Sequence, residues 1–197
     1  WHPEYLTFEV TVSYKPERDY HRIYDGMSFS DYVKKAYEKA DKIGGQINIA
    51  AVPPRKDEIL RATEYYEKIL PGMDVTIHLN TEATKEIMNA ADAVIVAVGA
   101  HDITLPIEGA DKAVSSWDVL AGKVEVAGKV AVIGGGLVGA ETAEFLAHKG
   151  CEVSIIEMTD TLAGNTGKTD QTILIGHLKG YKVKLLTECK VKEITAT

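Results

Sequence analysis

The sequence predicts an α/β protein whose mostly parallel sheets carry helices on both faces. Strand and helix patterns alternate along most of the 197 residues. An unbroken apolar run at residues 93–98 is typical of a strand buried in a parallel sheet. A glycine-rich turn at residues 134–139 joins another apolar run to a helical pattern. These patterns form two series that residues 100–128 link, so we expect two units with a boundary near residue 110.

The first series begins with apolar and polar residues that alternate at 6–14, which predicts a half-buried strand. Ser30 is placed to cap a helix that runs through Val33, Ala36, Tyr37 and Ala40. An amphipathic pattern predicts a further helix at 57–70, which Pro71 and Gly72 end. The remaining elements of this series are a strand at 75–79, a short helix at 84–90 and the apolar strand at 93–98.

The second series starts with a helical turn at 116–120. A strand, a helix and a second strand follow at 130–133, 137–149 and 153–156, and then a helix at 169–178 and strands at 183–186 and 191–194. The stretch from Gly164 to Thr169 lacks the full spacing of a phosphate-binding loop, and no strand leads directly into it, so we expect an ordinary loop there.

Composition excludes several classes of function. Hydrophobic residues make up 45% of the chain and charged residues 26%, as in ordinary globular proteins. The net charge of −7, without a basic cluster, argues against nucleic acid and against an anionic membrane as partners. Cys151 and Cys189 form no CxxC pair, and the six histidines show no metal-ligand spacing, so we expect no metal site. A cytoplasmic location is expected, with both thiols reduced.

The glycine turn carries the strongest functional signal. Gly134 permits a tight turn, Gly136 leaves room for a pyrophosphate beside the backbone, and Gly139 lets the following helix approach the strand. The N–H groups at the start of that helix would then face the phosphates. The predicted cofactor-binding residues of the turn are Gly134, Gly135, Gly136, Leu137, Val138 and Gly139.

An acid completes this pattern. Glu157 ends the second strand, where a carboxylate accepts hydrogen bonds from a ribose diol and repels a 2′-phosphate. No arginine follows it, so we expect NADH rather than NADPH. The unit that contains this turn is therefore expected to have a Rossmann-like fold. The alternative is a glycine turn that only packs a helix on a sheet.

Two stretches together resemble a known family. They are residues 37–56, which include Tyr-Glu-Lys-Ala-Asp-Lys-Ile-Gly-Gly-Gln and Ala-Ala-Val-Pro-Pro-Arg-Lys, and residues 129–158, with the strand at 93–100 between them. The chain resembles the pyridine nucleotide-disulfide oxidoreductase-like part of NADH:flavin oxidoreductases. That group includes enoate reductases, 2,4-dienoyl-CoA reductases and trimethylamine dehydrogenase.

The resemblance implies a Rossmann-like fold with two incomplete nucleotide-binding units. One is a partial flavin nucleotide-type unit at residues 37–110 and the other is an NADH-binding unit at residues 111–197, with residues 1–36 unassigned. It implies that Glu38 holds an adenosine ribose, that Gly45 and Gln46 lie along the flavin nucleotide, and that Gly99 ends a strand beside it. It also implies that Glu141 lies near the nicotinamide. From the residues alone, Glu38 and Glu141 can also be interpreted as ordinary surface acids, and Glu144 is expected to be a solvated surface acid. No acid–base catalytic residue is predicted.

The chain departs from the family pattern before Glu38, where Gly26 is the only glycine and no GxGxxG occurs. It also ends before the NADH unit would close. We therefore expect a piece of a larger reductase that binds NADH and passes hydride to a flavin of the intact enzyme, while FAD binds weakly to this chain alone. The alternative is a non-catalytic dinucleotide-binding module. The expected protein partner is the rest of a larger reductase or a second copy of the chain.

Overall fold

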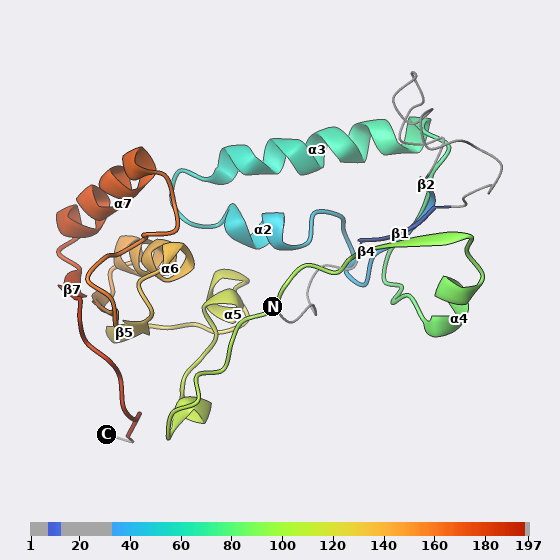
Figure 1. Cartoon of the computed structure of the whole chain (residues 1–197). Coiled ribbons are helices and arrows are strands. Elements are labelled where there is room, and N and C mark those ends of the chain that lie inside the picture. The colour runs from blue at the N-terminus through green and yellow to red at the C-terminus, as the bar shows by residue number, and fades with distance from the viewer. Residues whose placement is uncertain (1–7, 13–32, 196–197) are drawn as a thin grey trace. The chain divides into compact units, whose positions relative to one another are not determined.

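A computed structural model describes residues 8–12 and 33–195 (Figure 1). The chain divides into two compact units. The first comprises residues 1–48 and 59–101, and the second comprises residues 49–58 and 102–197. No helix within the described part of the chain is both long enough and apolar enough to cross a membrane. The α/β fold class expected from the sequence is confirmed.

The first unit contains a four-stranded mixed sheet in the order β3-β2-β1-β4. Its strands are β1 (Phe8–Val12), β2 (Val33–Tyr37), β3 (Thr76–His78) and β4 (Ala93–Ala97). β2 and β3 run parallel, whereas β1 runs antiparallel to both β2 and β4. The carboxyl ends of β2, β3 and β4 therefore lie on the same side of the sheet, at the ends of their strands, together with the amino end of β1.

Two expectations for this sheet are wrong. The helix predicted through Val33 and Ala40 is replaced by strand β2, because Ala36 and Tyr37 are buried where β2 lies between β1 and β3. Its expected cap, Ser30, lies outside the described residues. The apolar run at 93–98 does form a strand, β4, but this strand is antiparallel to its neighbour and lies at the edge of the sheet. Val96 is 63% exposed within the described structure. The apolar run at 93–98 therefore forms a strand without being buried on both faces.

The helices associated with this part of the chain follow the predicted positions. The helix expected at 57–70 comprises a 3₁₀ turn (Asp57–Ile59), α3 (Leu60–Ile69) and a second 3₁₀ turn (Leu70–Gly72). The short helix α4 (Lys85–Asn89) is capped by Thr84, whose Oγ1 accepts the Ile87 N–H over 3.4 Å. An additional helix, α2 (Gln46–Ala50), follows the two glycines of the family-like stretch.

The second unit has an all-parallel sheet in the order β5-β6-β7. Its strands are β5 (Lys129–Ile133), β6 (Glu152–Ile156) and β7 (Lys184–Leu186), and its helices are α5 (Ser116–Leu120), α6 (Leu137–His148) and α7 (Lys168–Gly180). A 3₁₀ turn (Ala110–Lys112) precedes α5. The expected strand at 191–194 is not formed: Glu193 makes a single bridge to Glu108, and the Ile194 N–H donates to the Glu108 carbonyl.

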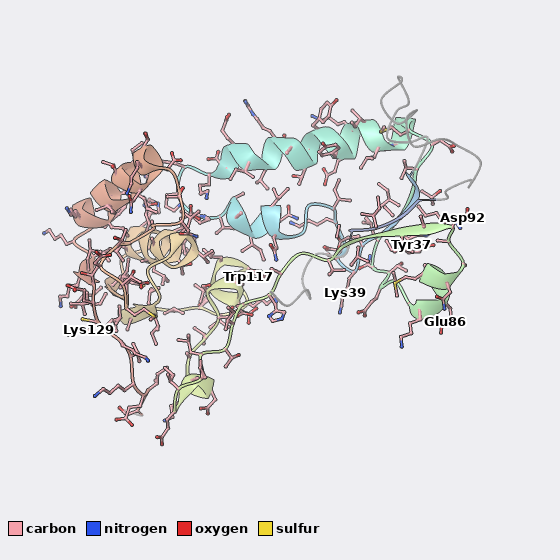
Figure 2. All side chains as sticks on the ribbon, viewed as in Figure 1. Tyr37, Lys39, Glu86, Asp92, Trp117 and Lys129 are labelled. Atoms are coloured by element: carbon pink, nitrogen blue, oxygen red, sulfur yellow. The ribbon has the colours of Figure 1, made fainter. Side chains whose placement is uncertain are left out.

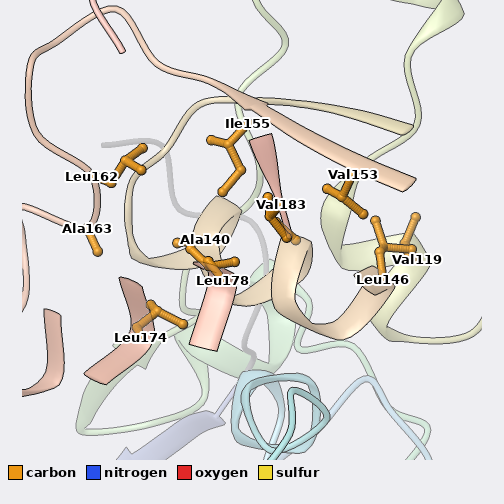
Figure 3. Close-up of a cluster of buried hydrophobic side chains, with 11 residues drawn as sticks. Val119, Ala140, Leu146, Val153, Ile155, Leu162, Ala163, Leu174, Leu178 and Val183 are labelled. Carbon is orange, nitrogen blue, oxygen red and sulfur yellow. The ribbon is translucent and has the colours of Figure 1, made fainter. Parts of the chain in front are cut away.

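The core of this unit lies between α6, α7 and the sheet (Figure 3). Ile155 of β6 and Leu178 of α7 are fully buried, as is Ala140 on α6. The small side chains of α6 allow this helix to lie close to the sheet, which fixes the glycine turn that precedes it. The buried cluster consists of Val119, Ala140, Ala143, Leu146, Val153, Ile155, Leu162, Ala163, Leu174, Leu178 and Val183.

Candidate nucleotide-binding site

The glycine turn lies between β5 and α6, at the carboxyl edge of the parallel sheet. Gly134 has a φ of +96°, which glycine adopts without strain, and its N–H donates to the Ile156 carbonyl at the end of β6. α6 begins at Leu137, with Gly136 as its N-cap. Val138, in the first turn of α6, is 48% exposed. The turn therefore presents a helix N-terminus at the place where parallel α/β sheets bind ligands.

The glycines of the turn have different steric roles. A Cβ on Gly139 would collide with the carbonyl oxygen of Gly134, so this glycine permits the close contact between helix and turn. A Cβ on Gly135 would collide with the side chain of Leu162. By contrast, a Cβ on Gly136 would meet its nearest neighbour, Asn165 Oδ1, only at 3.9 Å. Gly136 is exposed, so packing within the described structure does not explain its missing side chain.

Glu157 is tied directly to this turn. Its Oε2 accepts the Gly135 N–H over 2.7 Å, and its Oε1 accepts the N–H and Oγ1–H of Thr159 over 2.7 and 2.9 Å. Burial acts to raise the pKa of Glu157, but the hydrogen bonds from Thr159 and Gly135 outweigh burial, so the pKa lies below its ordinary value. The carboxylate is therefore held in its charged form beside the turn, as recognition of a ribose diol requires.

Glu141, on the same helix, is engaged in an ion pair. Its Oε1 lies 2.5 Å from Nζ of Lys56, and its side chain is only 14% exposed. The ion pair with Lys56 holds Glu141 at a defined position. Glu141 is therefore not the freely solvated surface acid that was the alternative interpretation. The role of Glu141 toward a nicotinamide stays a prediction.

A second ion pair involves a residue that sequence reasoning treated as an ordinary surface acid. Glu144 is 3% exposed and contacts the guanidinium of Arg55. Its Oε1 also lies 3.0 Å from Nδ1 of His177 on α7. Arg55 and Lys56 are adjacent in the sequence and thus bind two acids of α6, Glu144 and Glu141. No local pattern could reveal these pairs, because 89 and 85 residues separate the partners.

In the first unit, Glu38 follows directly after β2, between Tyr37 and Lys39, which Figure 2 labels. Its Oε1 accepts the Ala40 N–H over 2.8 Å. Its Oε2 is buried and has no hydrogen-bond partner within the described structure. Burial raises the pKa of Glu38, although the N–H groups of Ala40 and Lys39 lower it in part. Glu38 is thus no exposed surface acid, and its free oxygen fits a hydroxyl donor such as a ribose.

The residues after Glu38 form a compact loop. Gly44 and Gly45 both have positive φ, and a Cβ on Gly44 would meet Thr63 Cγ2 at 2.5 Å. The side chain of Gln46 is directed to the strand-end loop, since its Nε2 donates to the Ala100 carbonyl over 2.5 Å. Gly99, just before this carbonyl, also has a positive φ. The structure therefore brings Gln46 and the Gly99 loop together, while their position beside a flavin nucleotide stays a prediction.

The sheet direction limits how a flavin dinucleotide fits this unit. Glu38 and Gly99 follow strands whose carboxyl ends share one edge, where Glu9 of β1 pairs with Tyr37. β1 runs the other way, so Val12, its last residue, lies opposite Val33 and Ala93 at the far edge. A turn that follows β1 would begin on the side away from Glu38. The described residues thus fit the ribose of a flavin dinucleotide and do not supply a glycine turn for its pyrophosphate.

The chain belongs to the pyridine nucleotide-disulphide oxidoreductase family, whose model matches residues 7–197. It is 45% identical over 164 residues to a bilirubin reductase of Mediterraneibacter gnavus, covering 81% of this chain and 26% of that protein. It is 39% identical over 163 residues to a cinnamate reductase of Clostridium sporogenes, covering 80% of this chain and 24% of that protein.

Among solved structures, a 2-naphthoyl-CoA reductase matches with a TM-score of 0.76 and 27% identity, over 82% of this chain and 25% of that one. The chain spans about a quarter of the length of these relatives. The resemblance expected from the sequence is thereby confirmed, and the chain is homologous to NADH-dependent flavin oxidoreductases. Residues 8–12 and 33–195 contain no cluster of three or more metal-binding side chains.

Proposed function

We propose that the chain is the NADH-binding portion of a flavin-dependent oxidoreductase, in which hydride passes from NADH to a flavin of the intact enzyme. The observation that carries this proposal is the contrast among the glycines of the turn. Gly135 and Gly139 are required by packing, whereas Gly136 is bare beside the start of α6 with no close neighbour. That is the position where a pyrophosphate approaches the backbone in this type of turn.

The chain's contribution is binding and placement. The start of α6 supplies N–H donors and the positive end of the helix dipole for the phosphates. Glu157 would accept hydrogen bonds from the adenosine ribose, with its charge maintained by Thr159 and Gly135. The redox chemistry is that of the nicotinamide, which supplies a hydride when bound.

Isothermal titration with NADH tests this proposal. Gly136→Ala and Gly136→Val place one or three carbons beside the turn, and we expect them to weaken NADH binding by about tenfold or more, which is ~1.4 kcal/mol. The alanine variant should unfold at nearly the wild-type temperature, because its Cβ has no neighbour closer than 3.9 Å. Gly176→Ala, on α7 at a position where the added Cβ would have no neighbour within 4 Å, is the matched control and should bind as the wild type does.

Equal NADH affinity in the wild type and in Gly136→Val would overturn the assignment. Gly139→Ala gives a useful contrast, because its Cβ would collide with the Gly134 carbonyl oxygen and should destabilise the fold itself. The unfolding temperature thus distinguishes Gly136→Ala, which should lose NADH binding with its fold intact, from Gly139→Ala, which should lose binding because it unfolds.

A second candidate function is a dinucleotide-binding module without its own flavin. The direction of β1 favours it, since no described turn serves a flavin pyrophosphate on the side of Glu38. The two functions differ in one simple observation. The intact protein would be yellow under the first function, and NADH would bleach this colour, whereas under the second function NADH would bind and bleach no flavin.

A further inference from the structure

The loop between β6 and α7 packs against the glycine turn. Leu162 and Ala163 are buried in the core of the second unit, and the Ala163 N–H donates to the Gly135 carbonyl over 2.7 Å. The Leu162 carbonyl in turn accepts a hydrogen bond from Nε2 of Gln171 on α7 over 2.6 Å. This part of the loop is therefore anchored. The residues that follow it, up to Gly167 at the N-cap of α7, are mostly exposed.

Within that exposed part, Asn165 makes a specific contact with the start of α6. Its Oδ1 accepts the Leu137 N–H over 3.0 Å, across a separation of 28 residues. A helix N-terminus is commonly capped by the side chain of its own N-cap residue. The N-cap of α6 is Gly136, which has no side chain, so the remote loop supplies the acceptor instead. Both Asn165 and this hydrogen bond are exposed.

The acceptor position that Asn165 fills is the one that a pyrophosphate oxygen needs. An N–H group donates one strong hydrogen bond, so Leu137 cannot serve the amide oxygen and a phosphate at full strength together. We propose that Asn165 determines the affinity of this turn for a dinucleotide by occupying the Leu137 N–H in the free protein and leaving it on binding. The inference rests on the proposed dinucleotide function and adds a residue that competes with the ligand.

The buried residues of the loop limit which part of it can move. Leu162 and Ala163 stay in the core, whereas Asn165 and Thr166 lie between Gly164 and Gly167, two residues of high backbone freedom. Displacement of the amide thus needs only a local change in this segment. The carboxylate of Glu157 keeps its bond to the Gly135 N–H, so the ribose side of the site is unaffected.

Titration of three variants with NADH tests the inference. Asn165→Ala removes the competing oxygen and should bind NADH about 2- to 10-fold more tightly than the wild type, which corresponds to the net worth of one hydrogen bond. Asn165→Asp places a charged acceptor at the helix N-terminus and should bind at least about tenfold more weakly. Thr166→Ala, whose backbone N–H keeps its bond to the Ala163 carbonyl, is the control and should match the wild type.

Two ligand fragments show whether the competition is with the pyrophosphate. The gain of Asn165→Ala should persist with ADP-ribose, which contains the pyrophosphate, and vanish with adenosine, which lacks it. In the ligand-free protein, the amide resonance of Leu137 should shift in Asn165→Ala and not in Thr166→Ala, because the substitution removes the acceptor of that amide.

The outcomes separate this inference from the proposed function. NADH binding that is unchanged or weakened in Asn165→Ala overturns the inference and leaves the NADH site standing. Absence of NADH binding in the wild type and in Asn165→Ala overturns the function together with the inference. Binding that is detectable only in Asn165→Ala supports both.

Discussion

The backbone N–H of Gly135 donates a hydrogen bond to Oε2 of Glu157 over 2.7 Å, although 22 residues separate them. The bond joins the turn after β5 to the end of β6, and these are the two places that hold the pyrophosphate and the ribose in a dinucleotide site. Both parts of the site therefore belong to one hydrogen-bonded frame. The charge of Glu157 then has consequences for cofactor choice as well as for stability.

We expect NADH to bind at least about tenfold more tightly than NADPH, because a 2′-phosphate would lose a hydrogen bond to Glu157 and meet its charge, each at a cost on the order of 1–3 kcal/mol. Glu157→Gln removes the charge and should reduce this discrimination. Dissociation constants for the two cofactors with wild type and variant provide the measurement. Similar constants for both cofactors in the wild type would contradict the assignment of Glu157.

Glu157 should also stabilise the fold in a pH-dependent way. Its pKa in the folded state lies below the ordinary 4.5, so its stabilising contribution is present above pH 4.5 and is lost as the pH falls through the folded-state pKa. Glu157→Gln should therefore lower the free energy of unfolding by about 2 kcal/mol at neutral pH, with a difference that shrinks in acid. Glu152→Gln, at the start of the strand that Glu157 follows but half exposed, should show a small effect.

Glu38 should show the opposite pH dependence. Burial raises its pKa above 4.5, so its contribution to stability is fully present below that pH and is lost as the pH rises through the folded-state pKa. Glu38→Gln should therefore raise the unfolding temperature near pH 7 and leave it almost unchanged near pH 4. Thermal unfolding at the two pH values gives the comparison, with Glu82→Gln, an exposed acid of the same unit, as the control. A destabilised Glu38→Gln at neutral pH would contradict this account.

The pair between Arg55 and Glu144 should be worth more than a surface ion pair, since the Glu144 side chain is only 4% exposed. A double-mutant cycle with Arg55→Ala and Glu144→Ala should give a coupling energy of about 1–3 kcal/mol. The exposed pair between Lys184 and Glu152 is the reference and should give less than about 1 kcal/mol. Equal coupling in the two cycles would show that burial of Glu144 has no energetic consequence.

We expect FAD to bind this chain no more tightly than micromolar, and the purified protein to be colourless. The physical reason is that Glu38 can hold a ribose, while two phosphate charges lose their water without a helix N-terminus to replace it. A flavin fluorescence titration measures the affinity. Stoichiometric FAD in the purified chain would refute the prediction and show that phosphate contacts come from elsewhere.

The turn from Gly134 to Gly139 could be predicted because its signal is local: strand, turn, helix and second strand follow one another within 30 residues, and their order sets their geometry. The direction of β1 could not be predicted, because alternating apolar residues indicate a strand without indicating its neighbours. The same limit explains β2, whose residues fit a helical pattern until Ala36 and Tyr37 are placed between two other strands.

The contacts that complete the site could not be predicted for a related reason. Asn165 reaches Leu137 across 28 residues, and Arg55 reaches Glu144 across 89 residues. Each of these side chains has an ordinary local setting, and its partner is decided only when the core of the second unit forms. Glu144 was readable as a solvated acid because burial on one face of α6 depends on α7 and on the loop at residues 53–56.

Residues 49–58 belong to the second compact unit although the chain on both sides of them belongs to the first. The polypeptide therefore passes between the units three times, and the gene segment that encodes the second unit is discontinuous. A fragment that starts at Asp102 would lack Arg55 and Lys56, leaving Glu144 buried beside His177 without its guanidinium partner. Recombination or domain exchange between relatives can preserve this unit only when residues 49–58 and 102–197 are exchanged together.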